Sequence, residues 1–501
     1  MLRRAQHVST RRVLALTLLV ALAGCAGPLN PRLATYSAEG YRYANVRTDP
    51  RQEELFVVLA FSGGGTRAAA FSYGVLEGLR GVTYQSGTRS MLDEVDVISS
   101  VSGGSFTAAH YALFGVEGFP RFERNFLYRN IQGALVLRAL APWNWVRLLR
   151  DDYSRIELAA ELYDETVFDG ATFRRLLEQS RGRRPYLLLN ATDMTSTARF
   201  EFTQDQFDLL CSDLSDVPVA RGVAASSAFP VLLSPLTLQN HGGAAPCNVY
   251  QPPLWLANAL KSADQPRRAT LAQTLLSYRD DVRSRPFVHL LDGGLADNIG
   301  LRGPYVALSG QDSAWSVYSK INDGKIKRVL VIAVNAKTSK DPGWDARQSA
   351  PGVIDVLSVA ANGPMGNYSF ESVQLVDEHF KKLTGDLANY RACEKIGKDQ
   401  CGPNFRMPFD PPSEANVQFF PVELSFDKLA GKAHDELRRC LEGLATSFAL
   451  PDAQVTLLRQ VARHLLVNAK PFRDAMTSID RNWTSAPAPI DPAVVKEACG
   501  R

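Results

Sequence analysis

Long apolar runs and a surplus of one charge are both missing from this 501-residue sequence. The longest apolar run near the start, residues 13–22, is about half as long as the roughly 20 residues that a membrane-spanning helix needs, and no other stretch is apolar enough. We therefore expect no transmembrane helix. The formal net charge of +4 equals the charge of the four arginines within residues 1–24, which hold no acidic residue, so the rest of the chain is neutral. This balance speaks against a nucleic-acid-binding protein.

Histidine and cysteine are also scarce, with seven residues of each. Their spacing contains no close pairs of the kind that hold zinc, so we expect no metal and no other cofactor. Beyond Cys25, which belongs to the leader described next, six cysteines remain, and an even number permits three disulfides. Cys393–Cys401 is the most local pair, and Cys211–Cys247 with Cys440–Cys499 would complete one scheme, but the sequence leaves the pairing open.

Residues 1–25 have the pattern of a targeting leader. Arginines precede the short apolar run, which ends in Leu22-Ala23-Gly24-Cys25 and resembles the lipobox of bacterial lipoproteins. The resemblance implies a signal peptide over residues 1–24, acyl chains such as palmitate on Cys25, and a tether over residues 25–50. Ala26 lacks the carboxylate that signals inner-membrane retention, which favours a lipid-anchored protein of the outer membrane in the cell envelope. An ordinary signal peptide or an apolar N-terminal anchor is the alternative.

Short apolar runs alternate with helical patterns between residues 51 and 375. Fully apolar runs of strand length are typical of buried parallel strands, and their alternation with helices predicts a sheet covered on both faces. The expected strands are 55–61, 95–98, 186–190, 200–202, 287–291 and 329–335. Insertions are expected near 120–165, where Trp143 and Trp145 are interleaved with arginines, and near 239–285. Residues 376–501 are expected to be mainly helical and packed on the catalytic domain, with helices at 377–390, 427–448 and 452–466 and a strand-like run at 417–424.

The first of three chemical motifs is Ser100-Val101-Ser102-Gly103-Gly104, which lies between an expected strand and an expected helix. A serine with small neighbours at such a junction describes a nucleophile elbow, in which a tight turn exposes the hydroxyl group. Ser100 stands where the usual G-x-S-x-G pattern has its first glycine. By itself the pentapeptide fits an ordinary loop about as well.

Glycine-rich motifs lie on either side of this serine in the sequence. Ser62-Gly63-Gly64-Gly65-Thr66-Arg67 joins the first strand to the first helix, and its glycines let backbone N–H groups gather where a tetrahedral intermediate develops negative charge. A phosphate-binding loop fits poorly because no G-K-S/T follows. Leu291-Asp292-Gly293-Gly294 ends an apolar strand, where a carboxylate could take the proton of a serine hydroxyl. Taken alone, this motif is a common D-G turn.

In this order the three motifs resemble those of the patatin-like phospholipases, and residues 190–193, 200–202 and 220–230 match further motifs of that family. The resemblance implies an α/β fold of three layers, α/β/α, with a mainly parallel central sheet, a catalytic domain over 51–375 and a helical C-terminal extension. It implies hydrolysis of acyl esters of membrane lipids, of the phospholipase A or lysophospholipase type. Ser62 and Ala68 depart from the family, which often has aspartate and glycine at these positions.

The resemblance also assigns roles to residues. Ser102 would be the nucleophile and Asp292 its base, and the backbone N–H groups of Gly64, Gly65 and Gly103 would form the oxyanion hole. Supporting motif positions are Gly63, Arg67, Gly104, Gly293 and Gly294, with Arg67 expected to hold the loop or a phosphate.

A catalytic histidine is the main alternative to this dyad. His110 follows Ser102 on the same expected helix and points away from it, and His289 faces the opposite side of its strand from Asp292. The dyad in turn requires burial to raise the pKa of the aspartate from its ordinary value near 3.9. The alternative function is a catalytically inactive lipid-binding or scaffold lipoprotein, which the intact motifs argue against. In either case the segment around Trp143 and Trp145 could contact a membrane interface.

Overall fold

A mixed eight-stranded sheet forms the centre of the molecule, with the strand order β10-β9-β1-β4-β5-β8-β7 and β6 paired to β5. In this computed structural model the described residues are 30–46, 54–85, 87–182, 184–230, 232–243, 246–247, 254–261, 266–309, 325–338, 344–346, 348–408 and 417–500. The strands of the sheet are β1 (Leu55–Phe61), β4 (Val95–Val101), β5 (Tyr186–Asp193), β6 (Arg199–Glu201), β7 (Leu236–Gln239), β8 (Phe287–Asp292), β9 (Arg328–Asn335) and β10 (Gln418–Ser425). A separate small hairpin pairs β2 (Thr83–Tyr84) with β3 (Arg89–Ser90).

Five neighbouring strands, from β10 through β9, β1 and β4 to β5, run parallel, and they form the larger part of the sheet. Nearly every residue of β1, β4, β5 and β9 is buried, as their continuous apolar sequences predict for strands covered on both faces. Beyond β5 the direction changes, because β8 and β6 are antiparallel to β5 and β7 is antiparallel to β8. The mainly parallel α/β fold predicted from the sequence is therefore confirmed.

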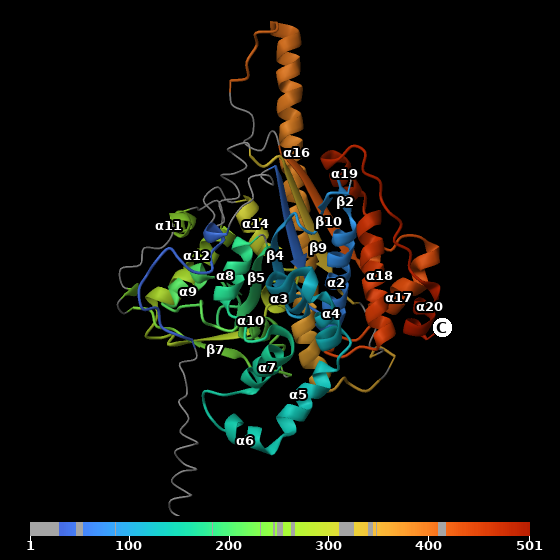
Figure 1. Ribbon diagram of the computed structural model, residues 1–501. Helices are drawn as coiled ribbons and strands as arrows, with labels where there is room; N and C mark the ends of the chain where they lie inside the picture. The colour runs from blue at the N-terminus through green and yellow to red at the C-terminus, as the bar shows by residue number, and fades with distance from the viewer. Residues whose placement is uncertain are drawn as a thin grey trace, which may run out of the picture.

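Helices flank the sheet on both faces (Figure 1). Those that belong to the first three quarters of the chain are α2 (Gly65–Gly81), α3 (Gly103–Phe114), α4 (Phe119–Phe122), α5 (Ile131–Leu140), α6 (Pro142–Leu148), α7 (Arg155–Tyr163), α8 (Phe173–Arg181), α9 (Gln204–Leu209), α10 (Val219–Ser226), α11 (Leu254–Lys261), α12 (Pro266–Asp280), α13 (Gly294–Asp297) and α14 (Arg302–Ser309). The others are α16 (Val353–Cys401), α17 (Asp435–Glu442), α18 (Asp452–Asn468), α19 (Lys470–Ile479) and α20 (Pro492–Cys499). Among the described residues, no helix is both long enough and apolar enough to cross a membrane.

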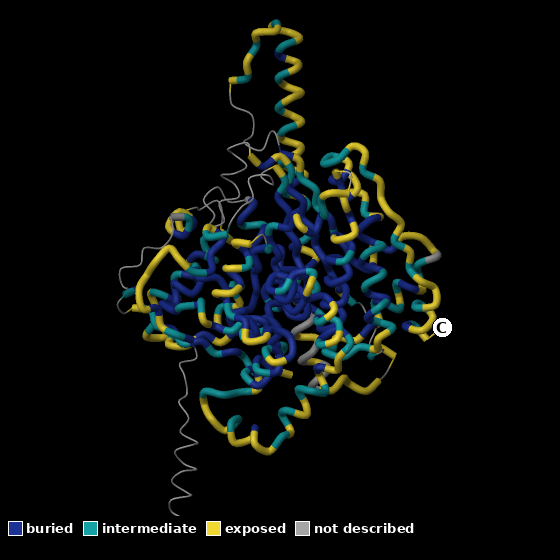
Figure 2. Tube along the Cα trace, viewed as in Figure 1, coloured by how far each residue is buried: buried dark blue, intermediate teal, exposed yellow. Residues whose placement is uncertain are grey.

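The C-terminal part of the chain is built into the central fold. β10 forms one edge of the sheet, α18 packs along α2, and α16 is long enough to extend well beyond the body of the molecule (Figure 1). The helix expected at 427–448 is shorter than predicted, because only α17 is α-helical and two 3-10 turns precede it. Figure 2 shows that buried residues surround the sheet, whereas the outer part of α16 and the α5–α6 region are largely exposed.

Within the described ranges the chain forms two disulfides, Cys211–Cys247 and Cys440–Cys499. Cys393 and Cys401, the most local of the pairs considered from the sequence, are instead free and exposed. Both lie on α16, where eight residues of helix correspond to a rise of about 12 Å. A disulfide requires its Cα atoms within about 7 Å, so this expected pairing is wrong.

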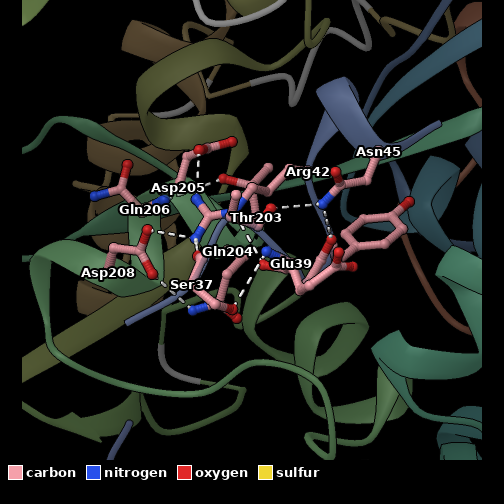
Figure 3. A network of polar contacts seen from close by, with 12 residues as sticks. Ser37, Glu39, Arg42, Asn45, Thr203, Gln204, Asp205, Gln206 and Asp208 are labelled. Carbon is pink, nitrogen blue, oxygen red and sulfur yellow. Dashed lines mark hydrogen bonds and ion pairs between the residues drawn. The ribbon is translucent and has the colours of Figure 1, made fainter. Parts of the chain in front are cut away.

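Part of the stretch expected as a tether, residues 30–46, packs against α9. Arg42 forms ion pairs of 2.6 Å with both Asp205 and Asp208, and its guanidinium also donates to the carbonyl oxygen of Ser37 (Figure 3). Burial raises the pKa of Asp208 to about 6, and the charge of Arg42 opposes that rise. The expected signal peptide and Cys25 lie outside the described residues.

Candidate active site

Ser102 lies at the junction of β4 and α3, as expected for a nucleophile elbow. Its backbone φ is 49° and its ψ is −121°, a conformation that residues other than glycine seldom adopt. The turn brings other backbone segments so close that its glycines have no room for a side chain. A Cβ atom on Gly104 would lie 2.7 Å from the carbonyl oxygen of Ser62, and one on Gly103 would lie 2.7 Å from the backbone nitrogen of Gly65.

Asp292 ends β8, which is antiparallel to β5, and Ala191 is its partner in the register. The carboxylate is buried and accepts a hydrogen bond from the Gly294 backbone N–H at 2.8 Å. The Ser102 hydroxyl also lowers the pKa of this carboxylate. Burial raises the pKa of Asp292 to about 6, and the Gly294 N–H and the Ser102 hydroxyl oppose the rise. The structure therefore brings together the serine and the aspartate, which lie 190 positions apart in the sequence.

The glycine-rich loop lies beside Ser102 because its strand, β1, is the parallel neighbour of β4, with Phe61 opposite Ser100. Gly64 and Gly65 have φ values of 137° and 62°, which favour glycine. Within the described part of the chain, the backbone N–H groups of Gly64, Gly65 and Gly103 make no hydrogen bond, whereas that of Gly63 donates to Asn298 O at 3.0 Å. The three open donors stand at the N-termini of α2 and α3, where negative charge is favoured.

Ser226, the last residue of α10, joins the two catalytic loops. Its carbonyl oxygen accepts the backbone N–H groups of Ser102 and Gly293, each at 3.1 Å, and its hydroxyl oxygen accepts the Ser102 N–H at 2.9 Å. The next turn continues this link, because Ala228 O accepts the Asp292 N–H at 3.0 Å. The sequence analysis noted the 220–230 motif but missed this role of Ser226.

The strand β5 supports the site from within the sheet. Asn190 donates from its side chain to Ser99 Oγ and to Ser100 O, both at 3.0 Å, and so fixes the end of β4. Thr192 donates its hydroxyl to the carbonyl oxygen of Asp292 at 2.8 Å. The matching 190–193 motif is therefore explained by hydrogen bonds that hold the ends of the strands on either side of β5.

The guanidinium of Arg67 lies beside the glycine-rich loop, since a Cβ atom on Gly64 would be 2.9 Å from Arg67 Nη2. Its buried guanidinium donates to Ala336 O at 2.9 Å, Leu444 O at 3.0 Å and Thr446 Oγ1 at 2.9 Å. Burial lowers the pKa of Arg67 to about 10. Of the two expected roles, these contacts favour holding the loop over binding a phosphate. Ser62, one of the two departures from the family motif, also contributes here by accepting the Ala336 N–H at 2.9 Å.

Residues from the C-terminal part of the chain complete the surroundings of the site. Ser447 O accepts the Thr66 N–H at 2.8 Å, and a Cβ atom on Gly65 would clash with that same oxygen. On the other side, a Cβ atom on Gly294 would clash with Met365 of α16. Nothing in the local sequence patterns signals these contacts, because each joins segments far apart in the chain.

The two histidines considered as alternatives to the dyad, His110 and His289, make other contacts. His110 is buried against the rings of Phe114 and Phe122, and burial lowers its pKa to about 3. His289 is exposed, and its Nδ1 lies 3.1 Å from Thr237 Oγ1. Among the described residues, no histidine makes a hydrogen bond to Ser102 or Asp292.

A strained serine between a parallel strand and a helix, a glycine loop with open N–H donors and a buried carboxylate together have the layout of a serine hydrolase site. Residues 59–305 match the model of the family described as patatin-like phospholipase. This stretch of the chain is therefore a patatin-like phospholipase domain. The residues that contact Arg67 and Gly65 from the C-terminal side, 336 and 444–447, lie outside the matched range.

Further comparisons give distant similarities only. No curated protein matches the chain. The structure of human GIVD cytosolic phospholipase A2 in complex with methyl gamma-linolenyl fluorophosphonate has a TM-score of 0.39 and 13% identity over 91% of this chain and 61% of that chain. VipD from Legionella pneumophila has a TM-score of 0.26 and 12% identity over 87% of this chain and 71% of that chain. The chain thus spans about three fifths of the length of the human enzyme.

Proposed function

We propose that this chain is a lipid acyl hydrolase of the phospholipase A or lysophospholipase type, acting through Ser102 and Asp292. The observation that carries the proposal is the juxtaposition of a serine at a strained elbow and a buried carboxylate whose pKa the serine hydroxyl lowers. The match of residues 59–305 to the patatin-like phospholipase model supports a lipid ester as the substrate.

In the proposed reaction, Ser102 Oγ attacks the ester carbonyl carbon while Asp292 takes the hydroxyl proton. The carbonyl oxygen becomes an oxyanion, which the N–H groups of Gly64, Gly65 and Gly103 stabilise. The proton passes to the leaving alcohol, and an acyl-serine remains. Water then attacks the acyl-serine with Asp292 again as base, which releases the fatty acid and restores the hydroxyl of Ser102.

The raised pKa of Asp292 answers the objection that a carboxylate is too weak a base for a serine hydroxyl. A base works best when its pKa lies near the working pH, and a value of about 6 is closer to neutrality than the ordinary value near 3.9. At pH 7 the carboxylate is still mostly ionised and so able to accept a proton. The open N–H donors lower the cost of the negative charge that the attack creates.

The test is release of fatty acid from phospholipid and lysophospholipid vesicles by the wild type, Ser102→Ala and Asp292→Asn. We expect both variants to fall to background while the fold, measured by circular dichroism, stays intact. Ser180→Ala is a matched control, because this serine is equally buried but bonds only to Leu177 O in α8. Activity that survives in Ser102→Ala would show that the elbow is not the nucleophile. An inactive wild type would favour the lipid-binding or scaffold lipoprotein.

We further propose, from the sequence of the leader, that Cys25 is acylated and anchors the protein in the outer membrane of the cell envelope. Metabolic labelling with palmitate, followed by membrane fractionation, tests this. We expect label and outer-membrane recovery in the wild type and neither in Cys25→Ser. Label that persists in Cys25→Ser, or a wild type without label, would exclude acylation at this cysteine.

A further inference from the structure

The helices α5 and α6 carry a dense group of exposed apolar side chains. They protrude from the body of the molecule, and Figure 2 shows this region as largely exposed. Three of the side chains, Leu137, Trp143 and Leu149, are 72%, 73% and 85% exposed. The full group is Val136, Leu137, Leu140, Trp143, Trp145, Val146 and Leu149. So many large apolar groups within residues 136–149 indicate a surface that is covered in use.

This α5–α6 segment, residues 131–149, is a built structure with its own hydrogen bonds. Asn130 caps α5 by accepting the Gly133 N–H at 2.7 Å. Across the junction of the two helices, Asn144 donates to Arg138 O at 2.9 Å and Trp145 donates its indole N–H to Ala139 O at 3.0 Å. The apolar side chains are therefore held outward by an ordered turn.

The charges of the segment suit a surface of lipid phosphates. Residues 129–150 contain four arginines and no aspartate or glutamate. Three of these arginines, at 138, 147 and 150, form ion pairs with Glu165, Glu161 and Asp152, all outside the segment. The pairs of Arg138 and Arg147 hold the segment to the body, whereas the pair of Arg150 with Asp152 is local, and all three offset much of the charge. Apolar insertion should therefore supply most of the binding, with a smaller contribution from attraction to anionic lipid.

The segment is also connected directly to the candidate active site. Gln132 in α5 exchanges two hydrogen bonds with Phe448, from its backbone N–H to Phe448 O at 3.2 Å and from the Phe448 N–H to its Oε1 at 3.3 Å. The preceding residue, Ser447, accepts the Thr66 N–H beside the open donors of Gly64 and Gly65. A lipid surface in contact with α5 and α6 would thus lie on the part of the molecule that frames the oxyanion hole.

We propose that the α5–α6 segment inserts its apolar face into the surface of a phospholipid bilayer and so places the site at its substrate. The inference rests on the proposed function and explains how the enzyme would reach a substrate that is held in a bilayer. Tryptophan suits this position, because its ring is apolar while its N–H group is polar. The two helices, of ten and seven residues, are too short to span a bilayer and so would lie within its interface.

The test uses the full chain with Cys25→Ser as the parent, so that the expected acyl anchor is absent. Two variants of this parent are compared, each with two further substitutions. The first, Leu137→Ser with Trp143→Ser, changes the segment. The matched control, Phe370→Ser with Ile396→Ser, changes two side chains of α16 that are 69% and 54% exposed. Co-sedimentation uses vesicles of phosphatidylethanolamine with phosphatidylglycerol, and vesicles of phosphatidylcholine alone. We expect the segment variant to bind both at least about tenfold more weakly than the Cys25→Ser parent, and the control to bind like that parent.

Activity readouts separate this proposal from the proposed function. Hydrolysis of a soluble short-chain ester should stay within about twofold of the parent in the segment variant, while hydrolysis of vesicle phospholipid falls with binding. Ser102→Ala should bind vesicles as the parent does, so binding is measurable even if no lipid is cleaved. Equal vesicle binding by the segment variant and the parent would overturn the proposal. So would a parent dimer that the segment variant dissociates without losing vesicle binding, because a second copy would then cover the face.

Discussion

The candidate active site, called the centre below, and the α5–α6 segment place polar and apolar groups in opposite ways. In the centre, polar groups such as Ser102, Asp292 and Asn190 are buried, and hydrogen bonds hold each of them in position. In the segment, large apolar groups such as Trp143 and Leu149 are exposed, and no other part of the described chain covers them. The first arrangement suits chemistry that needs fixed atoms in a dry site, and the second suits contact with an apolar surface.

One short stretch of the C-terminal region touches both parts. Ser447 contacts the glycine-rich loop, and Phe448 contacts α5 and packs against the ring of Phe106. Arg67 binds the adjacent residues Leu444 and Thr446. The glycine-rich loop is therefore held in part by residues outside the range that matches the family model.

The largest effect in the centre is expected from Gly103→Ala. The added methyl group would clash with the backbone of Gly65, so the elbow and the glycine-rich loop must move apart. Because both supply oxyanion donors, we expect kcat on a soluble ester to fall by about 10²–10³. Gly81→Ala is the control, since a Cβ atom there meets nothing within 4 Å. An active Gly103→Ala would mean that the two loops do not form one oxyanion hole.

The pH dependence of activity should follow Asp292. Only the ionised carboxylate accepts a proton, so kcat/KM on a soluble ester is expected to fall about tenfold per pH unit below a pH of about 6. The arginines of the α5–α6 segment pair with Glu161 and Glu165 and not with Asp292, so vesicle binding by Ser102→Ala should not follow the same curve. A profile with its midpoint near the ordinary value of an aspartate would show that burial does not raise the pKa of the base.

A smaller effect is expected from Ser226→Ala. Its hydroxyl accepts the Ser102 N–H, but its carbonyl oxygen remains to accept the same group, so the elbow loses one of two hydrogen bonds. We expect kcat to fall about three- to tenfold with little change in KM. Ser227→Ala is the matched control, because Ser227 is equally buried and its hydroxyl bonds to Val223 O. Equal kcat values for the two variants would show that the Ser226 hydroxyl does not help to position Ser102.

Much of the centre could be predicted from the sequence because its parts are local motifs at strand ends. A serine between small residues and a run of glycines each require a particular backbone, and the structure shows that backbone at Ser102, Gly64 and Gly65. Continuous apolar runs predicted the buried strands for the same reason. The catalytic roles themselves stay predictions until the variants are measured.

The remainder depends on contacts between distant segments, which local patterns do not reveal. The apolar run before Asp292 has the same pattern in either direction, so the sequence did not show that β8 is antiparallel to β5. The partners of Arg67 lie more than 260 positions away. The expected Cys393–Cys401 disulfide is absent because both cysteines lie on one helix, about 12 Å apart along its axis. The sequence also did not decide whether Trp143 is exposed, since an apolar stretch with arginines also fits a helix that packs on the core.

The smallest expected effect, that of Trp143→Ala on stability, tests directly whether the α5–α6 segment is exposed while the residues around the centre are buried. Trp143→Ala should change the free energy of unfolding by less than about 0.5 kcal/mol, because the ring contacts little of the folded chain. Phe106→Ala should cost about 3–5 kcal/mol, because that ring is fully buried among Phe126, Tyr163 and Phe448. Urea unfolding followed by circular dichroism measures both. A loss of about 2 kcal/mol or more in Trp143→Ala would mean that the indole packs on the protein in solution, and the α5–α6 segment would then have no free apolar face for a bilayer.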